Sequence, residues 1–177
     1  MSRDIALTRP AQRSVRTGPG LTAQKLMAFL PYWPASDIVR FCPAALAAPG
    51  QISQYDGFTP EGLDGHHVNG ALTVGENIGD LGGITIAHKA YLLSLEGQEA
   101  PVIDGLTGSQ RVFLGWGQVW RTVTREAEQI RRLAIDPHSP PEFRANVVRN
   151  LDEFHDAFGV TDGDGMWLDE HQRVRIW

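Results

Sequence analysis

Two acidic side chains near the middle of the chain are spaced so that they could act together. Glu76 and Asp80 lie four residues apart, so on a helix both carboxylates would share one face. Neighbouring like charges are mildly destabilising unless a cation or a hydrogen-bond donor lies opposite. One interpretation is a metal site, in which one carboxylate binds the ion and the other holds a metal-binding histidine. The alternative is a solvated acidic helix start, where negative charge is favourable without a metal.

A second group of chemically useful side chains lies in residues 136–144. His138 precedes an expected helix start, where an imidazole can donate a hydrogen bond to a developing oxyanion. Asp136 is close enough in sequence to orient this ring. Arg144 follows within the helix and could bind a carbonyl or carboxylate of a substrate. The alternative is a loop histidine beside a surface arginine.

The remaining reactive residue types do not form a recognisable site. No His-x-x-x-His pair occurs in the 177 residues, and no nucleophile elbow, Walker loop or Rossmann glycine pattern is present. Cys42 is the only cysteine. It has no convincing base partner, which favours an inert thiol, and it cannot form an intramolecular disulfide.

Composition and charge are those of an ordinary globular protein. Hydrophobic residues make up 42% of the chain and charged residues 21%, values typical of one folded domain or part of a larger one. The net charge of −5 argues against nucleic acid as the main partner. The apolar run Leu26–Tyr32 is too short to span a bilayer, and no secretory signal is recognisable. We therefore expect a protein without membrane association, located in the cytoplasm.

Residues 1–50 differ in character from residues 51–177. The first stretch has a net charge of +4 and the second a net charge of −9. Six prolines interrupt any long helix in the first stretch. We predict a short helix over Leu21–Leu30 within an otherwise loosely ordered leader, residues 1–50.

Hydrophobic periodicity predicts a mainly α fold for the rest of the chain. A loop is expected over residues 57–74, followed by a helix over Glu76–Leu95. Gly79, Gly82 and Gly83 would each cost about 1 kcal/mol relative to alanine in an exposed helix. Their clustering predicts that another backbone or a bound group packs closely there.

Capping signals mark further helices. Thr107 and Gln110 fit a capping box that opens a helix with Trp116 and Trp120 on its apolar face. A mixed-charge, solvated stretch follows over residues 121–132. Ser139 and Glu142 fit a second capping box, with proline at the first helical position, for a helix running towards residue 150. Residues 151–158 predict one more helix, and no strong strand pattern or internal repeat is found.

Taken together, these motifs resemble the neprilysin and endothelin-converting-enzyme family of zinc metallopeptidases. Residues 75–83 resemble the Glu-Asn-x-x-Asp signature of that family, and residues 136–144 resemble its substrate-binding segment. Residues 173–177 resemble its C-terminal sequence, which also stops at tryptophan. Residues 54–56 and 114–120 fit as well, so the resemblance covers about residues 51–177.

The resemblance implies a truncated C-terminal helical part of a metallopeptidase catalytic domain. Glu76 would then be the third protein ligand of the catalytic zinc, and Asp80 would fix a zinc-binding histidine. His138 would stabilise the tetrahedral transition state, oriented by Asp136, and Arg144 would bind the substrate backbone. The implied reaction is attack of a zinc-bound water on a peptide bond.

The chain departs from the family where the zinc site should be completed. The family takes two zinc ligands and its general base from an upstream His-Glu-x-x-His helix, whereas no histidine precedes His66 here. Zinc held by Glu76 alone would have one protein ligand, and catalytic sites use three. The loss of resemblance near residue 50 leads to the hypothesis of a truncated or frame-disrupted gene product.

Two interpretations of function stay open. In the first, the chain is a metallopeptidase segment that hydrolyses peptides only when a second polypeptide supplies the missing groups. In the second, it is a non-catalytic helical interaction module that exposes Trp116, Trp120 and neighbouring apolar faces and associates with itself.

Overall fold

Helices make up nearly all of the regular structure in residues 43–176, the part of the chain that the computed structural model describes. They are α3 (Pro43–Asp56), α4 (Gly70–Ser94), α5 (Gly108–Val119), α6 (Glu126–Ile135), α7 (Pro141–Ala145), η2 (Asn146–Asn150), α8 (Asp152–Phe158) and η3 (Glu170–Gln172). Within these residues the only β feature is an isolated bridge between Ile103 and Leu106. The prediction of a mainly α fold is confirmed. No helix in this range is both long enough and apolar enough to cross a membrane.

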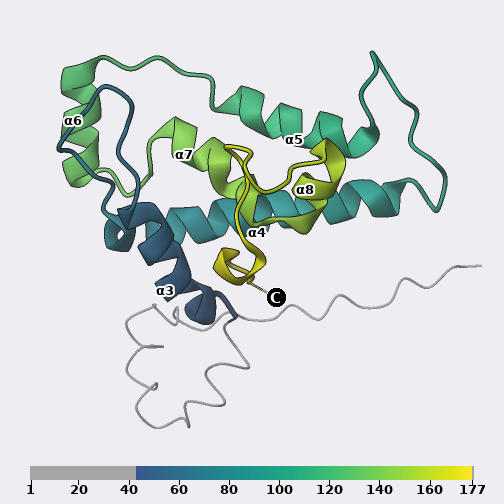
Figure 1. Cartoon of the computed structure of the whole chain (residues 1–177), viewed down its shortest axis with the longest axis horizontal. Helices are drawn as coiled ribbons and strands as arrows, with labels where there is room; N and C mark the ends of the chain where they lie inside the picture. The colour runs from purple at the N-terminus through teal and green to yellow at the C-terminus, as the bar shows by residue number, and fades with distance from the viewer. Residues whose placement is uncertain (1–42, 177) are drawn as a thin grey trace, which may run out of the picture. The chain divides into compact units, whose positions relative to one another are not determined.

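Helix α4 is the element on which the others assemble. Helix α3 packs against it over many residues, and α5 and η2 also contact it. Figure 1 shows α3 crossing near the start of α4 and α5 running alongside it. After α4 the chain contacts this helix twice more, first through α5 and later through η2, which connects the short helices α7 and α8.

Two apolar clusters hold this arrangement together. The larger one joins α3, α4, α5, η2, α8 and the C-terminal segment. Its most buried members are Ala47, Leu81, Ile84, Phe113, Val147 and Val148. The smaller one consists of Tyr55, Val68 and Phe143, with Phe58 stacked on Phe143 at a ring distance of 4.6 Å. This second cluster fixes α7 against the end of α3 and thereby positions Arg144, which directly follows Phe143.

Helix α4 begins earlier than the sequence predicts. Asn69 caps it, since its side-chain oxygen accepts a hydrogen bond from the backbone N–H of Leu72 at 3.0 Å. The helix therefore starts at Gly70, inside the loop predicted over residues 57–74. A side chain at Gly70 would collide with the backbone carbonyl of Ile52, so glycine permits the close approach of α3 and α4.

The glycines within α4 do not behave as predicted. A Cβ atom added at Gly79 or Gly83 would meet no other atom within 4 Å. The expectation that another backbone packs closely against these two positions is therefore wrong within the described part of the chain, whereas close packing of a bound group stays a prediction. Gly82, in contrast, is buried.

One of the two predicted capping boxes forms. The Gln110 backbone N–H donates to the Thr107 hydroxyl oxygen at 3.3 Å, and the Thr107 backbone N–H donates to the Gln110 side chain at 2.9 Å. The second box is wrong: α7 has Pro140 at its N-cap and no side-chain cap. Ser139 instead donates its hydroxyl hydrogen to Asn77 in α4. A proline does occupy the first helical position, but it is Pro141 and not the residue directly after Ser139, because Pro140 is the N-cap.

The other predicted helices agree with the structure in part. Helix α8 over Asp152–Phe158 matches the prediction for residues 151–158. The helix expected to run towards residue 150 is α7, which ends at Ala145 and continues as the 3-10 helix η2. The mixed-charge stretch contains α6, which buries none of its residues, in keeping with its predicted solvation.

The boundary predicted at residue 50 falls inside a helix. Helix α3 begins at Pro43, and Ala47 is buried in the main core. Residues 43–50 thus belong to the folded unit and not to a leader, because Ala47 packs on the same apolar cluster as α4. Residues 1–42, with the helix predicted over Leu21–Leu30, lie outside the described residues.

His88 gives the packing of α4 and α5 a predictable pH dependence. It is 4% exposed, stacks on Phe113 and has its Nε2 3.0 Å from the Ser109 hydroxyl oxygen. Burial lowers the pKa of His88 more than the charge of Glu153 raises it. The unfolded chain therefore binds this proton more readily, so folding stability should fall as the pH drops from 7 through about 6.5.

Replacing His88 with glutamine should flatten this part of the stability curve. Urea unfolding at several pH values between 7.5 and 5.5 measures the slope directly. His171→Gln, at an exposed position outside the core, is the matched control for the loss of one imidazole. An unchanged slope in His88→Gln would show that His88 does not titrate differently on folding.

Candidate functional site

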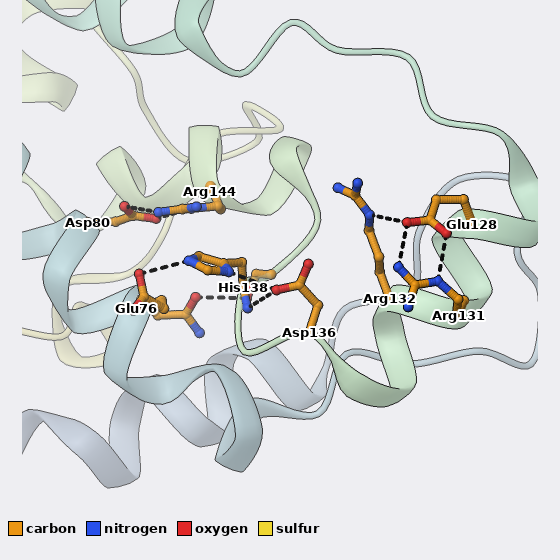
Figure 2. Close-up of polar contacts among 10 residues, drawn as sticks. Glu76, Asp80, Glu128, Arg131, Arg132, Asp136, His138 and Arg144 are labelled. Atoms are coloured by element: carbon orange, nitrogen blue, oxygen red, sulfur yellow. Dashed lines mark hydrogen bonds and ion pairs between the residues drawn. The ribbon is translucent and has the colours of Figure 1, made fainter.

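The five residues singled out from the sequence meet at one place, where α4 faces α7 and the loop before it. Glu76 and Asp80 come from α4, Arg144 from α7, and Asp136 and His138 from the segment between α6 and α7 (Figure 2). Their contacts join parts of the chain separated by more than 60 residues. The fold thus brings together the two groups that the sequence offered separately.

Asp80 and Arg144 form a buried, two-pronged ion pair. Arg144 donates from Nε to Asp80 Oδ2 at 2.6 Å and from Nη2 to Oδ1 at 2.7 Å. Their side chains are only 8% and 15% exposed. Hydrogen bonding to Asp80 raises the pKa of Arg144. Arg144 therefore stays charged, and its two bonds to Asp80 fix the guanidinium plane against α4.

Two tryptophans complete the surroundings of Arg144. The Trp120 ring lies 4.1 Å from the guanidinium carbon, a cation–π contact. Trp116 donates from its indole nitrogen to the Arg144 carbonyl oxygen at 3.2 Å. Both rings are half-buried. The sequence placed them only on an apolar helix face; their contact with Arg144 depends on α7, which sequence spacing does not reveal.

His138 lies between two carboxylates. Asp136 Oδ1 accepts a hydrogen bond from the His138 backbone N–H at 3.0 Å and lies 2.7 Å from ring atom Nδ1. On the other side of the ring, Nε2 is 3.2 Å from Glu76 Oε2. The hydrogen bonds from His138 hold the pKa of Asp136 below its usual range. The predicted orientation of His138 by Asp136 is thus present in the geometry.

The hydrogen-bonding capacity of an imidazole gives this arrangement a chemical direction. A neutral ring donates from one nitrogen only. If Nδ1–H donates to Asp136, the Nε2 lone pair faces the Glu76 carboxylate. These two electron-rich atoms repel each other unless a hydrogen on Nε2 or a cation lies between them. The side chains of His138 and Glu76 are 45% and 47% exposed, so solvent or a ligand can reach them.

The described residues do not complete a zinc site. Glu76 and His138 present two ligand atoms, whereas catalytic zinc uses three protein ligands and a water. Within residues 43–176, no group of three or more His, Cys, Asp or Glu side chains could hold a metal. Both Asp80 oxygens accept from Arg144, so a bond from Asp80 to a zinc-binding histidine stays a prediction. No catalytic step through zinc follows from these residues alone.

A cavity of about 650 Å³ opens beside His138 and Arg144. Trp120, Leu133 and Pro140 contribute apolar surface to it, and Arg121, Arg132, Gln129 and Thr122 contribute polar groups. A concave space of this size next to a charged donor and an imidazole suits binding of an extended organic ligand.

Comparison with known proteins identifies relatives of the whole site region. The model of peptidase family M13 matches residues 42–174, a range that contains all five site residues. Among curated proteins, endothelin-converting enzyme 1 of Mus musculus is 34% identical over 151 residues, which cover 83% of this chain and 19% of that protein. Neprilysin-1 of Caenorhabditis elegans is 41% identical over 132 residues, covering 71% of this chain and 17% of that protein.

Solved structures agree with these sequence matches. The Mycobacterium tuberculosis zinc metalloprotease Zmp1 in complex with an inhibitor is 56% identical, with a TM-score of 0.76 over 82% of this chain and 22% of its own. The open state of Zmp1 gives 58% identity and a TM-score of 0.75 over 82% of this chain and 23% of its own. The chain thus spans about a fifth of the length of the relatives it matches.

Proposed function

This chain belongs to peptidase family M13, and from that premise we propose that it forms the third-ligand and substrate-binding segment of a zinc metalloendopeptidase. In this proposal Glu76 supplies one zinc ligand, and the remaining ligands and the general base come from a second polypeptide segment with a His-Glu-x-x-His helix. The chain by itself does not hydrolyse peptides.

The meeting of Glu76 with His138, beside the Asp80–Arg144 pair, supports this proposal most directly. Glu76 Oε2 and His138 Nε2 lie 3.2 Å apart although the two residues are far apart in sequence. Both are exposed on the same side, where a metal and a substrate could approach. A purely structural use of these residues would not require an exposed carboxylate to face an exposed imidazole.

Each of the other residues has a role that fits its contacts. Asp80 occupies Arg144 Nε and Nη2, and a guanidinium has five N–H donors, so further donors remain for a substrate carbonyl. Asp136 fixes the His138 ring, which can then donate to an oxyanion that develops on the substrate. The adjoining cavity offers space for a side chain of a peptide.

A non-catalytic interaction module is the second candidate. Large apolar side chains are exposed on α4, including Ile86 at 56% and Leu93 at 79%, and such residues can mark a contact surface. Trp116 and Trp120, predicted to form that surface, are instead half-buried around Arg144. A module of this kind would bind partners without zinc and without hydrolysing them.

A transplant separates the two candidates. Residues 42–174, the range that the family M13 model matches, would replace the corresponding segment of Zmp1, which is 56% identical to this chain over 82% of its length. The chimera would be assayed for zinc-dependent peptide hydrolysis beside the isolated chain. We expect hydrolysis by the chimera and none by the isolated chain. A folded, zinc-loaded chimera without hydrolysis would contradict the proposed role.

The same assay tests His138 within the chimera. His138→Ala removes one oxyanion donor and should lower kcat about 100- to 1,000-fold, while the exposed side chain suggests little loss of stability. His171→Ala, at an exposed histidine outside the site, is the matched control and should retain kcat. Equal rates for the two variants would remove His138 from the proposed machinery.

A further inference from the structure

A chain of buried hydrogen bonds runs from the His138 loop to the start of α4. Ser139 donates from its hydroxyl to Asn77 Oδ1 at 2.7 Å. Asn77 donates from Nδ2 to the Thr73 hydroxyl oxygen at 3.0 Å, and Thr73 donates to the Asn69 carbonyl oxygen at 3.1 Å. These bonds run in one direction: Ser139 only donates, whereas the Asn77 amide and the Thr73 hydroxyl each donate one bond and accept another.

The three side chains are almost completely removed from water. Asn77 is 0%, Ser139 3% and Thr73 3% exposed. A polar group at such depth is costly unless it is paired. The pairing also fixes the orientation of the Asn77 amide, because Nδ2 must face Thr73 for Oδ1 to face Ser139.

The ends of the long-range bond lie next to the site. Asn77 follows Glu76 directly in α4, and Ser139 follows His138 directly in the loop. The Ser139–Asn77 bond spans 62 residues of sequence. It therefore couples the backbone that carries Glu76 to the backbone that carries His138, one residue from each.

The loop is stiff enough to transmit this constraint. Pro137, Pro140 and Pro141 surround His138 and Ser139, and each proline fixes its own φ angle and restricts the residue before it. Asp136 holds the His138 backbone and ring from within the loop. These restraints favour a rigid loop, and the Ser139–Asn77 bond is its buried contact with α4.

We infer that Asn77 and Ser139, supported by Thr73, are positioning residues that set the separation of the Glu76 carboxylate from the His138 imidazole. Their side chains are buried, so they act on the site through Glu76 and His138, their neighbours in the chain. Their importance for catalysis rests on the proposed function, whereas their effect on the position of His138 does not.

The test is the imidazole nitrogen spectrum of the full 177-residue chain labelled with ¹⁵N. In Ser139→Ala, the His138 ring signals should shift towards those of the exposed His171 in the same spectrum, because the ring loses its fixed place beside Glu76. Ser139→Thr keeps the hydroxyl and should restore the parent positions. Neither zinc nor hydrolysis enters this measurement, so its failure is separate from failure of the proposed function.

A matched control removes the same group elsewhere. Ser109→Ala deletes the hydroxyl that lies 3.0 Å from His88 Nε2, so it should shift the His88 signals and leave those of His138 unchanged. His138 signals at the parent positions in folded Ser139→Ala would overturn the inference. A His138 shift in Ser109→Ala as large as in Ser139→Ala would also overturn it, because the effect would then be a general loosening.

If Ser139→Ala does not fold, the far end of the chain of bonds gives an independent test. Thr73→Val removes the hydroxyl that orients the Asn77 amide, and Thr73→Ser retains it. The valine variant should shift the His138 signals and the serine variant should not. Identical His138 signals in both folded variants would contradict the positioning role.

Discussion

Asp80→Ala should lower the free energy of unfolding by about 3 kcal/mol, since it leaves a buried arginine without its partner. Arg144 is 15% exposed, accepts the Trp120 ring on its face and gives two hydrogen bonds to Asp80. The guanidinium cannot lose its proton, so the charge would remain buried or α7 would have to move. Either outcome costs much of the stability of a domain of this size.

Urea unfolding at pH 7 measures this loss. Glu128→Gln is the matched control, because Glu128 also accepts hydrogen bonds from arginines, at 2.7 and 2.8 Å, but on the exposed surface of α6, where ion pairs contribute little. It should leave the unfolding midpoint within experimental error. A double variant, Asp80→Leu with Arg144→Met, should recover part of the lost stability, since no charge is then left unpaired. If Asp80→Ala had the same unfolding midpoint as Glu128→Gln, the buried ion pair would contribute no more to the free energy of unfolding than the exposed one.

Glu76→Ala should have the opposite profile, with a large effect on zinc and a small one on folding. Within the Zmp1 chimera it removes a proposed zinc ligand, so zinc affinity should fall by at least about 100-fold, more than is usual for loss of a supporting residue. Glu76 is 47% exposed and its contact with His138 is 3.2 Å long, so stability should change little.

Competition with a zinc chelator measures the affinity of the chimera and its variant. Glu126→Ala, an exposed acid at the start of α6, controls for a general loss of negative charge and should leave the affinity as it is. Unchanged zinc affinity in Glu76→Ala would exclude this carboxylate as a ligand. Together, the two variants test whether two acids one helical turn apart have separate roles, Asp80 in folding and Glu76 in metal binding.

Features that depend on neighbouring residues in the sequence could be predicted. Thr107 and Gln110 form the expected capping box, because both bonds lie within one turn of helix. The helix over Asp152–Phe158 also agrees. The choice of Glu76, Asp80, Asp136, His138 and Arg144 as one group came from a resemblance, and their actual proximity required the fold.

Features decided by distant residues could not be predicted. Ser139 has the sequence context of a helix cap, but a buried partner 62 residues away takes its hydroxyl. Trp120 has the pattern of a core residue, but it packs on a guanidinium. The positioning role inferred for Asn77 has no signal in the spacing of its neighbours, since the partner of a buried amide in a helix is recognisable only from what lies opposite.

Zinc counted in two proteins side by side decides whether this segment belongs to a zinc site. The isolated chain and the Zmp1 chimera would be dialysed to equilibrium against zinc, and bound metal measured per chain. We predict no stoichiometric zinc in the isolated chain and about one zinc per chimera. One zinc per isolated chain that disappears in Glu76→Ala would show that the chain completes a site by itself. A folded chimera without zinc would show that the segment does not serve as part of a zinc peptidase.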